Sequence, residues 1–126
     1  MRLFDALRQR KSSTDKQRTG DAGEDHALVY LQQQRLTLVE RNFRCKGGEI
    51  DLIMRSGTSL VFVEVRNRAL GRHGSAADSV TRNKQQRLIV AAQIYLQRYR
   101  HPPACRFDVV AIDGAVITWL QNAIDS

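Results

Sequence analysis

The sequence predicts one α/β domain, in which helices cover both faces of a mixed central sheet of about five strands. The apolar pattern gives a helix, three strands, a helix and two further strands, in that order. The central pair of strands is apolar on both faces, as expected for strands that are covered on both sides. A length of 126 residues suits a single domain with a core of its own.

The first 19 residues differ in composition from the rest of the chain. They hold six basic and two acidic side chains, so they contribute +4 of the formal net charge of +7. Their apolar pattern is brief and a polar stretch follows it. We therefore expect residues 1–19 to form a basic, flexible arm and residues 20–126 to form the domain.

The first helix of the domain is expected at residues 21–34, where apolar residues recur at helical spacing. Glu24 falls on the same inward stripe, and two interpretations of it stay open. Asp21 and Glu24 stand at the spacing of a capping box, in which each would satisfy backbone donors of the first turn. Alternatively, Glu24 joins an acidic cluster at the edge of the sheet.

Three strands follow this helix. The first is expected at residues 36–43, and Gly47-Gly48 then allows a sharp turn. The next two, at residues 49–54 and 59–66, form an antiparallel hairpin, because β-branched and aromatic residues flank a turn signal at Ser56-Gly57.

The register of this hairpin decides where its charged side chains lie. A tight turn centred on residues 56–57 pairs Arg55 with Thr58, Asp51 with Phe62 and Glu49 with Glu64. Because side chains alternate along a strand, Glu49, Asp51 and Glu64 then share one face with Arg66. Asp51 and Glu64 become diagonal neighbours, about 7–8 Å apart at Cα.

Three acids that converge in a partly dry site repel one another unless a cation lies among them. Mg²⁺, or Mn²⁺ in its place, takes a few carboxylates and keeps positions open for water and phosphate oxygens. The arrangement predicts metal-assisted phosphodiester hydrolysis, with Asp51 and Glu64 as the metal ligands.

The second helix is expected at residues 82–100, with Thr81 as its N-cap. Its inward stripe brings Lys84 and Gln85 towards the acids. Two last strands are expected at residues 105–112 and 115–120, joined by a turn at Asp113-Gly114. Within them, we expect Asp108 to pair with a neighbouring arginine and Trp119 to pack on an edge strand.

The connection at residues 67–80 is long and carries Arg68 and Arg72. Long loops are often functional, so this one is a candidate to close over a nucleic acid backbone. A solvated basic loop explains the same residues equally well.

Composition points to a polyanionic partner, because 20 basic residues stand against 13 acidic ones. The domain itself carries +3 of the excess, which weakens the inference for the folded body. No apolar run reaches the length of a membrane span and no signal peptide is evident, so we expect a cytoplasmic protein. In a reducing compartment Cys45 and Cys105 are expected to be free thiols.

Several motifs resemble those of a known family. They are Gly20-Asp21-Ala22-Gly23-Glu24, Gly48-Glu49-Ile50-Asp51-Leu52-Ile53, Val61-Phe62-Val63-Glu64-Val65-Arg66 and Arg106-Phe107-Asp108-Val109-Val110. Together they look like the bacterial YraN family, which is similar to Holliday-junction resolvases of the PD-(D/E)xK nuclease superfamily. The resemblance spans about residues 16 to 120 and implies a restriction-endonuclease-like sandwich.

The same resemblance implies roles for residues at the predicted site. Asp51 and Glu64 would bind Mg²⁺, while Glu49 and Glu24 would support the metal or its water. Arg66, with Lys84 or Gln85, would hold the phosphate of a branched or structured DNA. Because a resolvase cuts two strands symmetrically, a homodimer is also expected.

The chain departs from the superfamily pattern at Arg66, where a lysine is usual. Arginine is effectively never deprotonated, so it cannot act as a base. This leaves two alternatives to an endonuclease. One is a catalytically silent nucleic-acid-binding module. The other is a protein-interaction domain whose acids form salt bridges with Arg41, Arg66 and Arg106.

Overall fold

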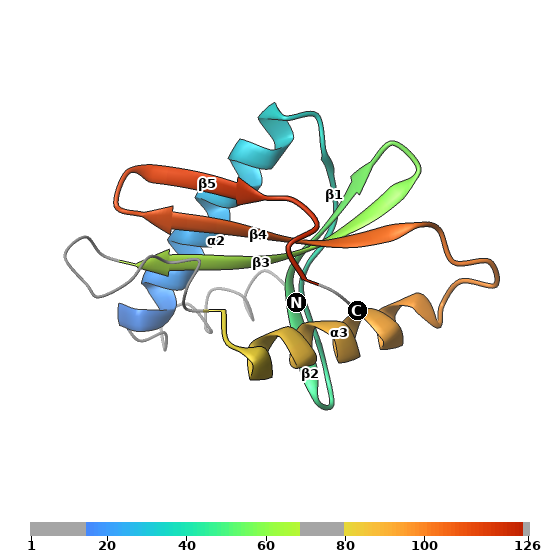
Figure 1. Ribbon diagram of the computed structural model, residues 1–126. Helices are drawn as coiled ribbons and strands as arrows, with labels where there is room; N and C mark the ends of the chain where they lie inside the picture. The colour runs from blue at the N-terminus through green and yellow to red at the C-terminus, as the bar shows by residue number, and fades with distance from the viewer. Residues whose placement is uncertain (1–14, 69–79, 125–126) are drawn as a thin grey trace, which may run out of the picture.

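A computed structural model describes residues 15–68 and 80–124, and it shows the predicted order of elements (Figure 1). The elements are α2 (Asp15–Gln33), β1 (Thr37–Cys45), β2 (Gly48–Ser56), β3 (Ser59–Arg68), α3 (Arg82–Leu96), β4 (Cys105–Asp113) and β5 (Val116–Leu120). Most of the predicted arm, at residues 1–14, lies outside the described residues, as does Arg72 in the long connection.

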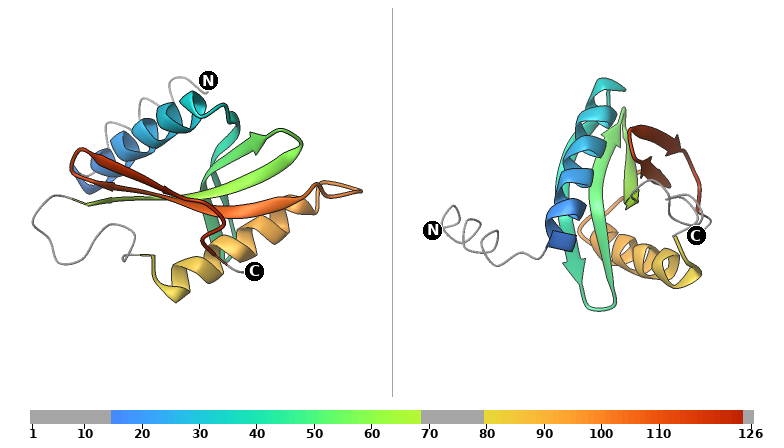
Figure 2. Two further views of the ribbon diagram at one scale, coloured as in Figure 1. Left: turned by 45° about the horizontal axis from the view of Figure 1, so that its top comes forward. Right: turned by 90° about the vertical axis from the view of Figure 1, so that its left-hand side faces the viewer.

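The five strands form one mixed sheet in the order β1-β2-β3-β4-β5. The β3–β4 pair is parallel and the other three pairs are antiparallel. A parallel pair needs a crossover connection, and α3 lies within it. Figure 2 shows α2 on one face of the sheet and α3 on the other, so the predicted α/β sandwich is confirmed.

Each helix covers its own hydrophobic core, because alternate residues of the central strands point to opposite faces. On the α2 side, Ala27 and Leu31 pack with residues that include Leu52, Val61 and Val63. On the α3 side, the core contains Ile53, Leu60, Phe62, Phe107, Leu88, Ala92 and Tyr95. β2 and β3 therefore contribute to both cores, as central strands do.

The predicted register of the β2–β3 hairpin is wrong by two residues. Ser56 pairs with Ser59, and Gly57 and Thr58 form the turn between them. Gly57 has a φ of 61°, which glycine adopts without strain, and this conformation favours the observed turn. Because the shift is an even number, the side chains of the paired residues stay on the faces that the prediction gave them. Ile50 is an exception beyond the paired residues, since it packs in the α3-side core and not with Leu52 and Met54 as expected.

The helix ends also differ from the prediction. α2 begins at Asp15, so Asp21 lies inside the helix and the predicted capping box does not form. Residues 15–19, expected in the arm, are helical. Thr81 is confirmed as the N-cap of α3, since its side-chain oxygen accepts the Lys84 N–H at 3.2 Å. α3 ends at Leu96 rather than at residue 100, and a tighter turn through Tyr99 follows it.

No helix in the described parts of the chain is long and apolar enough to cross a membrane.

Candidate active site

The strands β2 and β3 stop pairing next to the two predicted metal ligands. Leu52 and Val63 are the last residues paired in the ladder. Beyond them, the Val65 N–H donates to Asp51 Oδ2 at 2.8 Å, so a side-chain carboxylate takes the place of a backbone carbonyl. Asp51 and Glu64 are the next residues of the two strands beyond this last pair. Their carboxylates are neighbours, because the charge of Asp51 contributes to the raised pKa of Glu64.

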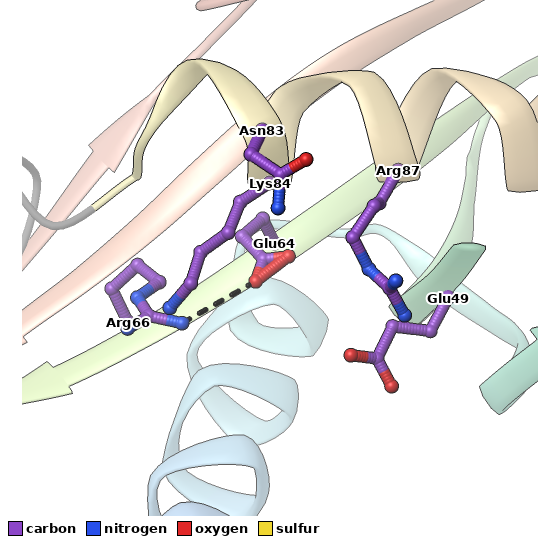
Figure 3. A pocket seen from close by; sticks show the side chains of 6 residues that line it. All are labelled: Glu49, Glu64, Arg66, Asn83, Lys84 and Arg87. Atoms are coloured by element: carbon purple, nitrogen blue, oxygen red, sulfur yellow. Dashed lines mark ion pairs between the residues drawn. The ribbon is translucent and has the colours of Figure 1, made fainter. Parts of the chain in front are cut away.

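A pocket of about 350 Å³ opens beside this point. It is lined by side chains from β2, β3 and the first two turns of α3, namely Glu49, Glu64, Arg66, Asn83, Lys84 and Arg87 (Figure 3). Arg66 Nη1 lies 3.6 Å from Glu64 Oε1. Asp51 is held next to this lining by its bond to Val65, the residue that follows Glu64.

The surroundings of Glu64 raise its pKa to about 8, against an ordinary value near 4.5. The largest cause is burial, and the neighbouring Asp51 carboxylate adds to it, while Arg66 and Lys84 oppose both. Burial also raises the pKa of Asp51, although the Val65 N–H partly offsets this. The fold therefore places two carboxylates where ionising both is unfavourable without further positive charge.

This donor set fits a hard divalent cation such as Mg²⁺, which accepts one or two carboxylates and completes its shell with water or phosphate oxygens. Among the described residues, however, no group of three His, Cys, Asp or Glu side chains is arranged to hold a metal. The expected convergence of three acids is therefore corrected to two. Glu49 is half exposed and lies 3.8 Å from Arg44 on β1.

Two further predicted site residues lie elsewhere. Glu24 lies on α2 and pairs with Arg41 of β1 at 3.5 Å, and Arg41 also binds Asp25 at 2.9 Å. The Gln85 side chain donates to the Val80 carbonyl oxygen at 3.2 Å. Neither residue is part of the pocket lining, so the structure does not bring them to the site. Arg68 is the last residue of β3, and its backbone pairs with Asp113.

Arg87 and Asn83 line the pocket but were missed in the sequence. The available signal was helical spacing, since Arg87 lies three residues after Lys84 and so shares its side of α3. The contact that places Arg87 was not visible in the sequence. A Cβ added to Gly48 would overlap the Arg87 carbonyl oxygen, so α3 rests directly on the start of β2.

Asp108 has the structural role that was expected. Its fully buried carboxylate accepts bonds from Arg106 Nε at 3.1 Å, from Trp119 Nε1 at 2.9 Å and from the Asn122 N–H at 2.8 Å. Trp119 lies on the edge strand β5, as predicted, and its ring also contacts Tyr30 edge-on. This network joins β4, β5 and the segment after β5.

The cysteines are free thiols, as expected, and three arginines named in the protein-interaction alternative form salt bridges. Cys45 and Cys105 are both free, and burial raises the pKa of the Cys105 thiol. Arg41, Arg66 and Arg106 each form a salt bridge with an acid of the same chain.

Fold and site together define an α/β protein with two adjacent, buried carboxylates beneath a helix that presents basic side chains. A family model described as "Uncharacterised protein family UPF0102" matches residues 23–112. The chain belongs to this family.

Its relatives match along most of their length. A UPF0102 protein of Herminiimonas arsenicoxydans is 64% identical over 117 residues, which cover 93% of this chain and 94% of the relative. One from Janthinobacterium sp. (strain Marseille) is 63% identical over 126 residues, covering all of both chains. One from Ralstonia pickettii (strain 12J) is 59% identical over 110 residues, which cover 83% of this chain and 88% of the relative.

Proposed function

We propose that the protein binds nucleic acid and hydrolyses its phosphodiester bonds with a divalent metal ion, Mg²⁺ or Mn²⁺, held by Asp51 and Glu64. The observation that carries the proposal is the position of these two carboxylates. They are neighbours, largely buried, where β2 and β3 separate, with Arg66 and Lys84 beside them. Buried like charges are costly for a fold, and such sites are often functional.

The reaction is attack by a water oxygen on phosphorus, with cleavage of the bond to the leaving sugar oxygen. A phosphate monoester and a hydroxyl group result, because the attacking water loses one proton and the leaving sugar oxygen gains one. A divalent cation at Asp51 and Glu64 would polarise the phosphate and lower the pKa of a bound water. The two carboxylates position that cation, and the pocket walls exclude part of the bulk water.

Two cations in the pocket have different roles. Arg66 keeps its charge at any relevant pH, so it stabilises the charge that develops on the phosphate but takes up no proton. Lys84 lines the same pocket, and an amine can exchange protons where a guanidinium cannot. We therefore assign the proton-transfer role, which Arg66 cannot fill, to Lys84.

The substrate class rests on the motifs. Their resemblance to the YraN family, and through it to Holliday-junction resolvases of the PD-(D/E)xK superfamily, supports branched or structured DNA as the substrate and a homodimer as the active form. The net charge of +7 supports a polyanionic partner.

A second function is binding of nucleic acid without cleavage. The specific observation in its favour is the Arg66–Glu64 ion pair at 3.6 Å, since a fixed arginine charge beside Glu64 offsets part of the charge that a metal ion would offset. In that case the pocket would be a phosphate-binding site only.

A cleavage assay separates the two functions. Wild type, Asp51→Asn and Glu64→Gln are incubated with four-way junction, flap and duplex DNA in Mg²⁺, Mn²⁺ or EDTA. We expect metal-dependent cleavage by wild type and a loss of at least about 100-fold in either variant, because each removes a metal-binding charge.

Glu40→Gln is the matched control, because Glu40 is an acid in a loose pair with Arg98 at 3.6 Å and is not part of the pocket lining. It should cleave like wild type. Salt-sensitive binding with no cleavage in any metal would favour the second function. Equal cleavage by wild type and both site variants would refute the proposed metal site.

A further inference from the structure

The charged side chains of the pocket lining divide into two groups (Figure 3). Glu64, Arg66 and Lys84 form one group, next to Asp51, and Arg87 and Glu49 form the other. Arg44 adds to the second group, because it is paired with Glu49 across β1 and β2 and lies 3.8 Å from it. We call Arg44, Glu49 and Arg87 the outer cluster.

Formal charges distinguish the two groups. The inner group holds Asp51 and Glu64, the two carboxylates that a divalent cation would take as ligands. In the outer cluster one acid faces two arginines, which leaves one positive charge in excess. The outer cluster therefore favours an anion at the edge of the pocket, where Arg44, which is not part of the lining, lies beside Glu49.

Backbone packing fixes the outer cluster in place. Gly48 lies against the Arg87 carbonyl oxygen, and Glu49 is the next residue along β2. This contact sets the acid and Arg87 side by side, one from the sheet and one from α3. Arg44 belongs to the neighbouring strand, so the two arginines come from different elements of the fold.

The acid in this cluster is weakly held. The Glu49 side chain is 50% exposed, its partner Arg44 is 75% exposed, and their closest atoms are 3.8 Å apart. Exposed pairs of this kind contribute little to stability, so another anion can replace the carboxylate at low cost. Guanidinium groups bind phosphate oxygens in a bidentate manner, which makes phosphate the anion of best fit.

We propose that Arg44 and Arg87 form a second phosphate-binding subsite, next to the acidic pair, and that a phosphate of the bound nucleic acid displaces Glu49 from it. The inference rests on the proposed function, in that the ligand is a polynucleotide. In this assignment Glu49 occupies the anion site until a phosphate replaces it, and it does not support a metal ion.

Binding of labelled duplex and four-way junction DNA to the full chain, measured in EDTA across a salt series, tests this subsite. We expect Arg87→Ala to weaken binding by about fivefold to tenfold and to lower the slope of log affinity against log salt by about one. Glu49→Gln should tighten binding by about threefold, since the competing carboxylate is lost.

Two variants serve as controls, and thermal unfolding shows whether each protein is folded. Arg100→Ala removes an exposed arginine beyond the far end of α3, and Glu40→Gln removes an acid from a comparable loose pair. Neither should change the affinity more than about twofold.

The subsite is refuted if Arg87→Ala leaves the affinity and the salt slope unchanged, if Glu49→Gln weakens binding, or if wild type binds neither DNA. Because EDTA removes metal ions, the result is independent of cleavage. The expected shifts without any metal-dependent cleavage by wild type would support the subsite and reject the nuclease. Metal-dependent cleavage without the shifts in affinity and salt slope would support the nuclease and reject the subsite.

Discussion

Glu64 is buried next to a second carboxylate, and its pKa of about 8 means that it holds a proton at neutral pH in the metal-free protein. In the unfolded chain the same group titrates near 4.5. Between these values the folded state binds the extra proton, so the stability of the fold decreases as the pH rises through this range. A metal ion at the site would displace that proton.

The pH dependence of stability therefore tests the environment of Glu64. In EDTA, the melting temperature of wild type should fall between pH 5 and pH 8.5 more than that of Glu64→Gln, which carries no charge at either pH. Each kcal/mol of difference corresponds to about 4 °C. Glu40→Gln should follow wild type. An identical fall in wild type and Glu64→Gln would mean that folding does not raise the pKa of Glu64.

At the scale of elements, the faces of the strands were predictable and the register was not. Period-two alternation placed Asp51, Glu64 and Arg66 on one face, and an error of two residues in the turn left this intact. That Asp51 bonds to the Val65 N–H depends on where β2 and β3 separate. Separation of strands leaves no local signal in the sequence, so this bond was not predicted.

The contact between Gly48 and α3 was equally invisible, because glycine at a turn is usually explained by its backbone freedom. A Cβ at this position would meet the backbone of Arg87, which cannot move aside as a side chain can. Gly57 gives a contrast, since nothing lies within 4 Å of a Cβ added there. A substitution of Gly57 would lose stability only because its φ is +61°.

Alanine substitutions separate these two effects. Gly48→Ala should destabilise the fold by about 3 kcal/mol, as expected for overpacking against a rigid neighbour. Gly57→Ala should cost about 1 kcal/mol, from its positive φ alone. Urea denaturation at one pH measures both. Equal costs for the two variants would show that α3 does not rest on β2 as described.

At the scale of the whole molecule, the sandwich was predictable because the order of elements determines it. A parallel β3–β4 pair requires a crossover, and α3 is the one helix between those strands in the described chain. Glu24 shows the limit of such reasoning. Its helix packs on the opposite face from α3, and it pairs there with Arg41, so membership of an inward stripe did not place it in the pocket.

The proposed hydrolysis depends on Asp51 and Glu64 sharing one divalent ion. Crystals of the metal-free protein, soaked in Mn²⁺ and measured at the manganese absorption edge, test this most directly. We predict an anomalous peak between the two carboxylates in wild type and its loss in Glu64→Gln. A map without a peak there, in which the Arg66 guanidinium still lies against Glu64, would contradict the proposed metal site.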